Sequence, residues 1–243
     1  MKTIRCTLFI FIVTLLCNDA IATENPRFTR KLQQYVESAA NEFEQISAER
    51  KEALQTLGDY IARQRQEVGQ AQVLFICTQN SRRSHLGQIW LQTAAQYYGL
   101  DGIRVYSGGL EASTFNERAA DALDRAGFQI NAAQQQSGNP RYVISPGNGY
   151  PTSIHYSKAY QDTQNPSIAF AAVMVCSEAD QSCPVVPGAD VRVPLPYEDP
   201  RYYDGTPSEA QKYDETTREI ARQMLYLADY VKNTAIQQME AKK

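Results

Sequence analysis

The chain has 243 residues, of which 43% are hydrophobic and 21% are charged, as in a soluble globular protein with one domain and an appendage. Its 24 lysines and arginines are outnumbered by 27 aspartates and glutamates, so no overall positive charge would attract nucleic acid. The composition excludes a general nucleic-acid-binding protein and leaves open a local site for a small anion.

The first 22 residues are typical of a leader rather than of a folded domain. Lys2 and Arg5 precede an apolar run, TLFIFIVTLL, that is too short to span a bilayer comfortably, and AIA at 20–22 offers a small-x-small cleavage site. We therefore expect a signal peptide over residues 1–22, export to the periplasm or the outside, and no stable membrane span after cleavage. An uncleaved anchor and a lipoprotein processed at Cys17 are weaker alternatives.

Cleavage would remove two of the five cysteines. The three that remain are Cys77, Cys176 and Cys183. An odd number of cysteines in an exported protein indicates at most one disulfide and one free, reactive thiol.

Residues 23–70 form a polar-rich segment with helical periodicity. Apolar side chains recur there at three-and-four spacing between Phe28 and Ile61, which predicts one or two helices packed on the main domain. This helical extension contains no group of residues typical of a catalytic site. We therefore expect it to pack on the main domain rather than to bind a partner.

Strands and helices alternate through residues 71–235, the expected catalytic domain. Strands are predicted at Val73–Ile76, Ile103–Tyr106, Phe170–Val175 and Val191–Leu195, and helices at Ser84–Tyr98, Asn116–Ala126 and from Pro207 to about Lys232. Because the strands are apolar throughout, we expect a three-layer α/β fold with a four-stranded parallel sheet flanked by helices. Residues 132–166, rich in Gln, Asn, Gly, Pro and Tyr, are predicted to be an insertion with local structure near the site.

The stretch VLFICTQNSRRS, residues 73–84, passes from a buried strand into a helix. Ligands bind at the carboxyl ends of parallel strands, and a loop that ends at a helix N-terminus can turn its N–H groups toward a tetrahedral dianion. Arg83 can add a bidentate clamp, and Ser84 can cap the helix and hydrogen-bond the sulfur. Because these surroundings favour a thiolate, Cys77 is predicted to be a nucleophile rather than a core thiol.

This loop resembles the phosphate-binding loop of the low-molecular-weight protein tyrosine phosphatase superfamily, which includes the thioredoxin-coupled arsenate reductases. VYSGG, at 105–109, is also similar to the second strand and turn of that family, and the similarity covers roughly residues 71–231. The resemblance implies that Cys77 is the nucleophile and Arg83 the oxyanion clamp. The other loop residues would bind the oxyanion (Thr78, Gln79, Ser81 and Arg82) or organise the loop (Asn80 and Ser84).

The resemblance also implies a general acid within LPYEDPRYYDGT. The Asp-Pro pair of the family corresponds here to the pair that begins at Asp199, so Glu198 and Asp204 are expected to be solvated carboxylates. Tyr202 and Tyr203 resemble an aromatic wall of the phosphatases, although they are offset by one residue, and ordinary surface packing is the alternative.

The stretch VMVCSEADQSCPVVP distinguishes this chain from a plain phosphatase. In the arsenate reductase branch, a cysteine pair with this spacing performs the redox step. The resemblance implies that arsenate adds to Cys77, that Cys176 attacks the adduct and releases arsenite, and that Cys183 captures Cys176 in a disulfide. A thioredoxin-like protein would then be the reductant, and no cofactor is implied.

Other interpretations stay open at this point. Cys176 and Cys183 could form a local structural disulfide, or could be inherited in a phosphatase that hydrolyses phosphomonoesters. Export would separate the protein from cytosolic thioredoxin, and Gln88 stands where the reductase branch carries an acidic residue in its cation site. The tyrosine-rich insertion at 132–166 could also shape a pocket for an aromatic phosphomonoester. An oxyanion-binding protein without turnover is the third possibility.

The remaining candidate residues favour structural roles. His85 and His155 are too scattered to predict a metal site, and His85 is expected to decorate the first helix. Leu86, Ile89 and Trp90 are expected to form the buried face of that helix.

Overall fold

Three stretches of the chain have a described structure in the computed structural model: residues 26–134, 138–183 and 185–240. The predicted signal peptide, residues 1–22, lies outside them. In the described stretches, no helix is both long enough and apolar enough to cross a membrane.

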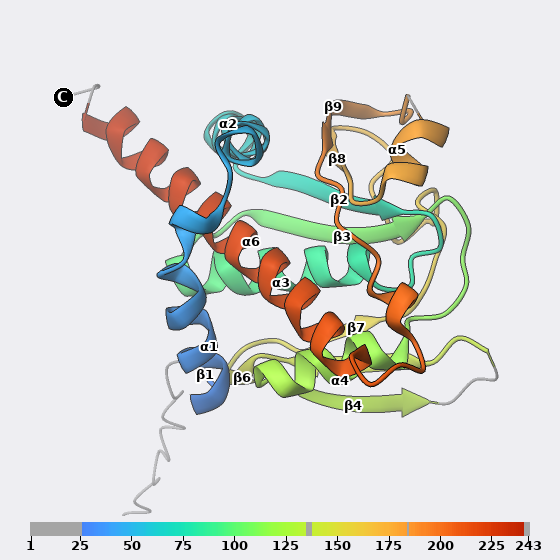
Figure 1. The fold of residues 1–243 in the computed structure, drawn as a ribbon. Helices are drawn as coiled ribbons and strands as arrows, with labels where there is room; N and C mark the ends of the chain where they lie inside the picture. The colour runs from blue at the N-terminus through green and yellow to red at the C-terminus, as the bar shows by residue number, and fades with distance from the viewer. Residues whose placement is uncertain (1–25, 135–137, 184, 241–243) are drawn as a thin grey trace, which may run out of the picture.

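A four-stranded parallel sheet forms the centre of the fold, in the order β3-β2-β8-β9 (Figure 1). Its strands are β2 (Ala71–Cys77), β3 (Ile103–Gly109), β8 (Phe170–Met174) and β9 (Ala189–Pro194). All residues of β8 are buried, and all of β2 except Gln72, as in parallel strands covered on both faces. The predicted α/β fold with four parallel strands is confirmed, and each strand lies close to its expected position.

Helix α3 (Arg83–Tyr98) packs on β2 and β3, and the long helix α6 (Glu209–Glu240) runs along α3 (Figure 1). Gly87 allows the close approach of α3 to β2, because a Cβ at this position would lie 2.5 Å from the ring of Phe75. The predicted face of this helix is fully buried: Leu86, Ile89 and Trp90. α6 continues past its expected end near Lys232.

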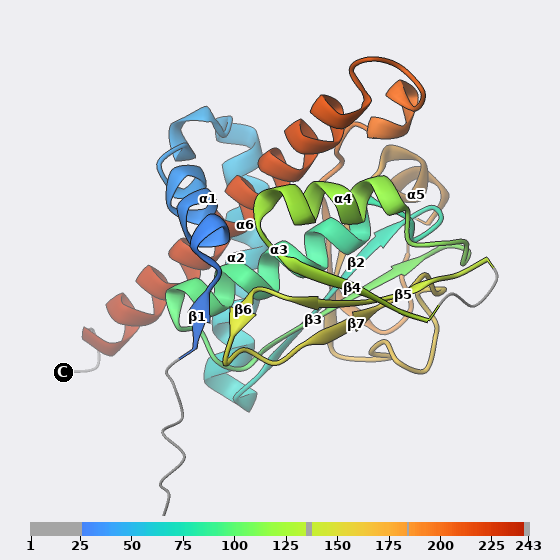
Figure 2. The same ribbon diagram turned by 90° about the horizontal axis from the view of Figure 1, so that it is seen from below.

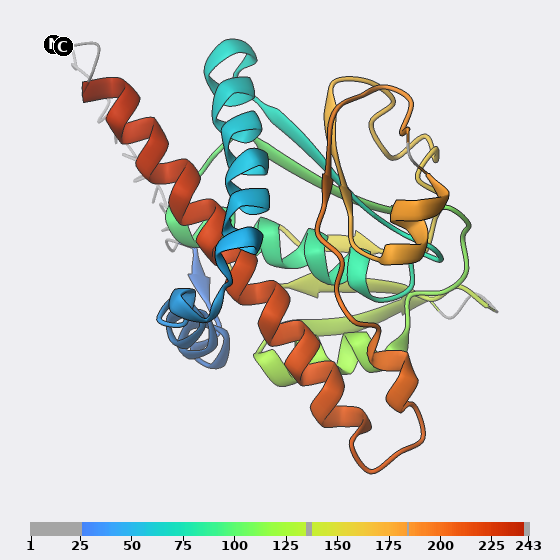
Figure 3. The same cartoon turned by 45° about the horizontal axis from the view of Figure 1, so that its top comes forward.

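The N-terminal segment folds as helices on the main domain. Helix α1 (Arg30–Ala40) packs on α6 and on α4 (Glu117–Ala126), and a short 3-10 turn, η1 (Phe43–Gln45), follows it. Helix α2 (Ala48–Val68) runs beside α6 and also contacts β2 and β9 (Figure 3). The extension therefore covers one side of α6.

A second, antiparallel sheet was not predicted from the sequence. Its order is β4-β5-β7, from β4 (Gln129–Gln134), β5 (Arg141–Ser145) and β7 (Ser153–His155), while β6 (Gly147–Asn148) pairs with β1 (Arg27–Phe28). Helix α3 lies between this sheet and the parallel sheet (Figures 1 and 2). The strands are short: β4 reads QINAAQ, β7 reads SIH, and β5, RYVIS, has only three consecutive apolar residues, so none carries the longer apolar pattern by which strands are predicted.

Candidate active site

The loop between β2 and α3 places a hydroxyl on the predicted nucleophile. Cys77 Sγ lies 3.1 Å from Ser84 Oγ. Asn80 Nδ2 donates to the same oxygen at 2.8 Å, so the Ser84 hydroxyl is free to donate its proton to a Cys77 thiolate. A hydrogen bond from Ser84 stabilises a thiolate both as nucleophile and as leaving group. The predicted cap is wrong, because Ser84 lies inside the first turn of α3 and Arg82 is the N-cap residue.

Asn80 gives the loop its left-handed turn, with a φ of 45°. Its carbonyl oxygen lies 3.0 Å from His85 Nε2, and His85 Nδ1 lies 3.3 Å from Ser107 Oγ. Since a carbonyl can only accept, Nε2 carries the ring proton and Nδ1 accepts from Ser107. Burial, reinforced by His155 and Lys158, lowers the pKa of His85 well below 6.5, so the ring is neutral at pH 7. The expectation that His85 decorates the helix is wrong, and its place directly after the loop is the signal that was missed.

The end of β3 lies against this loop. Leu110 N donates to Cys77 O at 3.0 Å, and Glu111 N donates to Thr78 O at 3.0 Å. A Cβ on Gly109 would lie 2.6 Å from Asn80 N, so only glycine permits the contact. The last glycine of SGG, at the end of β3, is therefore explained by the approach of two backbones.

The loop encloses a hollow of about 120 Å³ at the carboxyl end of β2. It is lined by Cys77, Thr78, Gln79, Ser81, Arg82, Arg83, Glu178, Asp199 and Arg201. A water molecule occupies about 30 Å³, so the hollow has room for one small tetrahedral oxyanion, whereas drug-sized ligands need about 300 Å³ or more. No described residue of the insertion at 132–166 lines it, and the expectation that the insertion shapes the pocket is wrong for the part described.

Asp199 reaches the hollow from the start of a 3-10 turn, η2 (Pro200–Tyr203), and pairs with two arginines. Its Oδ2 lies 2.7 Å from Arg83 Nη2, and its Oδ1 lies 2.9 Å from Arg82 Nε. Arg83 Nη1 also donates to Tyr197 O at 2.8 Å, which fixes the plane of the guanidinium group. The predicted clamp and the predicted acid therefore contact each other, and an incoming oxyanion would compete with the Asp199 carboxylate for the arginines.

The neighbours of Asp199 have other surroundings. Glu198 is exposed, and Asp204 accepts a hydrogen bond from Tyr213 Oη at 2.9 Å. Tyr202 is 63% exposed, and neither it nor Tyr203 lines the hollow. In this arrangement the two tyrosines therefore form no aromatic wall around the hollow. They lie at the surface, as in the alternative interpretation. Two further charged residues line the hollow, Glu178 and Arg201, and no motif in the sequence points to them.

The two downstream cysteines flank α5 (Ser177–Ser182). Cys176 is fully buried at its N-terminus, and its Sγ lies 3.4 Å from Oγ1 of Thr78, the residue next to the nucleophile. Cys183 is 8% exposed at the other end of α5, and its Sγ lies 3.3 Å from Val185 O. All three described cysteines are free. The structure thus brings Cys176 to the loop of residues 77–84, called the anion loop from here on, and holds Cys183 at the far end of α5.

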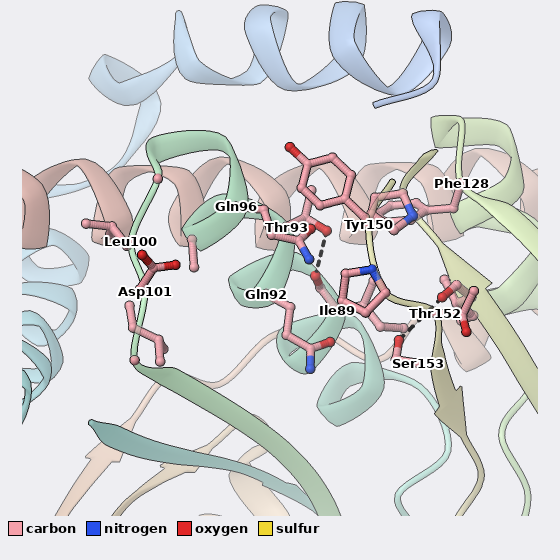
Figure 4. Close-up of a pocket in the computed structure, with 17 residues that line it drawn as sticks. Ile89, Gln92, Thr93, Gln96, Leu100, Asp101, Phe128, Tyr150, Thr152 and Ser153 are labelled. Atoms are coloured by element: carbon pink, nitrogen blue, oxygen red, sulfur yellow. Dashed lines mark hydrogen bonds between the residues drawn. The ribbon is translucent and has the colours of Figure 1, made fainter. Parts of the chain in front are cut away.

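A larger hollow, of about 590 Å³, lies between α3 and the segment 144–153 and contains no thiol (Figure 4). Gln92, Gln96 and Tyr150 are among its lining residues, and none of the predicted site residues reaches it. The described residues also contain no group of three or more His, Cys, Asp or Glu side chains that could hold a metal ion.

The chain is similar in sequence to known proteins. Residues 72–142 match the family model described as low molecular weight phosphotyrosine protein phosphatase. An arsenate reductase of Bacillus subtilis is 28% identical over 147 residues, which are 60% of this chain and 86% of that protein. Arsenate reductase 2 of Staphylococcus haemolyticus is 30% identical over 115 residues, which are 47% of this chain and 67% of that protein.

Solved structures also match this chain, at low sequence identity. A low molecular weight protein tyrosine phosphatase from T. tengcongensis matches with a TM-score of 0.45 and 18% identity, over 65% of this chain and 98% of that chain. An arsenate reductase in the phosphate binding state matches with a TM-score of 0.40 and 20% identity, over 69% of this chain and 98% of that chain. On the sequence matches, the chain belongs to the low-molecular-weight protein tyrosine phosphatase superfamily and is an enzyme related to its arsenate reductase branch.

Proposed function

We propose that this enzyme is a thiol-dependent reductase of small oxyanions, with arsenate as the substrate. The observation that carries the proposal is the contact between Cys176 Sγ and Thr78 Oγ1, which places a second buried thiol beside the nucleophile-bearing loop. The hollow of about 120 Å³ supports a small inorganic substrate. The names of the sequence relatives point to the same chemistry.

In the first step, the Cys77 thiolate attacks the arsenic atom of arsenate. One arsenate oxygen takes up a proton and leaves as water, and a bond forms between sulfur and As(V). Arg82 and Arg83 hold the remaining oxygens once the substrate has displaced Asp199 from them. Asp199, in the wall of the hollow, is the group placed to pass the proton.

In the second step, Cys176 attacks Cys77 Sγ. The sulfur–arsenic bond breaks and its electron pair stays on arsenic, which leaves as arsenite, while the two sulfurs form a disulfide. Cys183 then attacks Cys176 Sγ, and Cys77 leaves as a thiolate stabilised by Ser84. The two electrons come from two thiols, and an external dithiol must reduce the final disulfide between Cys176 and Cys183.

Phosphomonoester hydrolysis is the second candidate function, and the description of the matching family model favours it. The same nucleophile would form a phosphocysteine, with Asp199 as the acid for the leaving oxygen, and water would complete the reaction. Neither Cys176 nor Cys183 would be needed.

We also propose that the enzyme is exported, on the strength of the leader at residues 1–22. Its reductant would then be a thioredoxin-like dithiol protein of the same compartment, because cytosolic thioredoxin would not reach it.

The experiment compares two assays on the mature protein: arsenate-dependent oxidation of NADPH through thioredoxin and its reductase, and hydrolysis of p-nitrophenyl phosphate. Cys77→Ser should abolish both activities. Cys176→Ala and Cys183→Ala should eliminate arsenate turnover and spare ester hydrolysis. If the wild type never reduces arsenate while both variants hydrolyse the ester normally, the enzyme is a phosphatase. Phosphate binding with neither turnover would identify an oxyanion-binding protein.

A further inference from the structure

The insertion at 132–166 contacts the anion loop from outside the hollow. Ser157 Oγ donates to the carbonyl oxygen of Gln79 at 3.0 Å. Ser113 Oγ donates to the same oxygen at 3.0 Å, and Ser113 N donates to Ser157 Oγ at 2.8 Å. Two hydroxyl groups therefore hold one carbonyl of the loop, and the backbone N–H of Ser113 links the two serines.

Ser157 is itself held in place. Asn139 Nδ2 donates to Ser157 O at 2.8 Å, and Ser157 N donates to Asn139 Oδ1 at 3.0 Å. The next residue, Lys158, donates its N–H to Asn80 Oδ1 at 2.8 Å and accepts from Gly109 N at 2.9 Å. Ser157 is 2% exposed, so water does not replace these contacts.

The peptide plane gives these contacts a consequence for anion binding. In a trans peptide, the C=O of one residue and the N–H of the next point in opposite directions. Ser157 and Ser113 hold the Gln79 carbonyl, so the N–H of Asn80 points away from these two serines. His85 holds the Asn80 carbonyl, so the N–H of Ser81 points away from His85. Neither N–H donates to another described residue, so both are available to an anion.

We infer that Ser157 is a positioning residue of the anion loop: through the Gln79 carbonyl it orients the Asn80 N–H toward a bound oxyanion. The insertion then serves to keep the loop in its anion-binding conformation. This inference rests on the proposed function to the extent that the loop must bind a tetrahedral oxyanion.

The test measures the dissociation constant of inorganic phosphate by calorimetry. Ser157→Ala should weaken phosphate binding about three- to tenfold, the loss expected for one or two neutral hydrogen bonds. Ser157→Thr keeps a hydroxyl and should restore most of the affinity. Ser153→Ala is the matched control, because Ser153 lies in β7 of the same insertion and its side chain, among the described residues, bonds only to His155 and Ile144. The thermal midpoint of each variant is recorded alongside.

The outcomes separate the inference from the proposed function. Wild-type protein that does not bind phosphate would overturn the proposed function and the role of Ser157 together. Wild-type binding with unchanged affinity in Ser157→Ala, even with a lowered thermal midpoint, would overturn the positioning role alone. Equal weakening in Ser157→Ala and Ser153→Ala would also overturn it, because the effect would then be a general loosening of the insertion.

Discussion

At the scale of single residues, the contact of Asp199 with both arginines links substrate binding to catalysis. The carboxylate is buried and occupies guanidinium groups that an oxyanion would otherwise bind. Asp199→Asn removes this competing charge and also removes the proposed proton donor. We expect phosphate to bind about tenfold more tightly and kcat to fall by about 10²- to 10⁴-fold, the usual contribution of a general acid.

The measurement for Asp199→Asn is calorimetric phosphate binding together with steady-state rates on arsenate. Glu198→Gln is the matched control, since Glu198 is the adjacent carboxylate and is exposed. Weaker phosphate binding in Asp199→Asn would show that the carboxylate organises the arginines rather than competing for them.

The buried histidines make stability depend on pH. Burial, together with the charge of Lys158, lowers the pKa of His155 from 6.5 to about 3, and His85 and Lys158 are the titratable groups that face it. Below pH 6.5 the unfolded chain binds a proton that the folded protein does not, so stability is complete above pH 6.5 and falls toward pH 3. The loss is about 1.4 kcal/mol per pH unit for each buried histidine.

Urea unfolding between pH 7.5 and pH 4.5 measures this slope. In the His155→Gln variant, the slope of the unfolding free energy against pH should be smaller by the contribution of about one proton. The variant will also be less stable at pH 7. A slope unchanged by His155→Gln would mean that His155 is protonated in the folded protein.

At the scale of elements, helix α5 separates the relay cysteines. Six helical residues at a rise of 1.5 Å span about 9 Å, and a disulfide needs Cα atoms within about 7 Å, so α5 must unwind before Cys176 and Cys183 can bond. Arg192 of β9 opposes this change. Its Nη2 donates to Asp180 O at 2.6 Å and pairs with the Asp180 carboxylate, and its Nε donates to Cys183 O at 3.1 Å.

We therefore expect Arg192→Gln to form the disulfide between Cys176 and Cys183 several-fold faster. The reaction is followed with diamide as the oxidant in a Cys77→Ser background, by mass spectrometry of the alkylated thiols. Arg104→Gln, on an exposed position of β3, serves as the control. An Arg192→Gln variant that oxidises no faster than the control would show that α5 opens without breaking these contacts.

The elements also show how far the sequence alone could predict this molecule. Of the four parallel strands, β2 and β8 contain continuous apolar runs and β3 and β9 alternate apolar with charged residues. The loop after the first strand carries Cys77 and Arg83 at a recognisable spacing, so both the sheet and the loop could be predicted. The sheet of β4, β5 and β7 could not, because β4 and β7 are short and largely polar and β5 has only three consecutive apolar residues. His85 was missed for a related reason: its role depends on Asn80 O and Ser107 Oγ, and only the fold brings Ser107 close.

At the scale of the whole molecule, the N-terminal helices complete the packing around α6. Leu54, Leu57 and Ile61 of α2 are fully buried, and α2 contacts α6, β2 and β9. Burying each such side chain contributes about 1.5–3 kcal/mol, and a domain is stable by only about 5–15 kcal/mol in total. The part of the chain that carries no catalytic residue therefore supplies stabilisation comparable to the whole margin of folding.

Deletion of residues 26–68 should accordingly yield insoluble protein, or protein with a broad, non-cooperative thermal transition and no phosphate binding. Deletion of residues 26–29 is the control, because it removes only β1 and the Thr29 cap of α1 and leaves α2 in place. Circular dichroism and calorimetry on both deletions provide the measurement. A soluble 69–243 fragment that unfolds cooperatively and binds phosphate like the full chain would show that the α/β domain is stable alone, and that the buried face of α2 serves only to attach the extension.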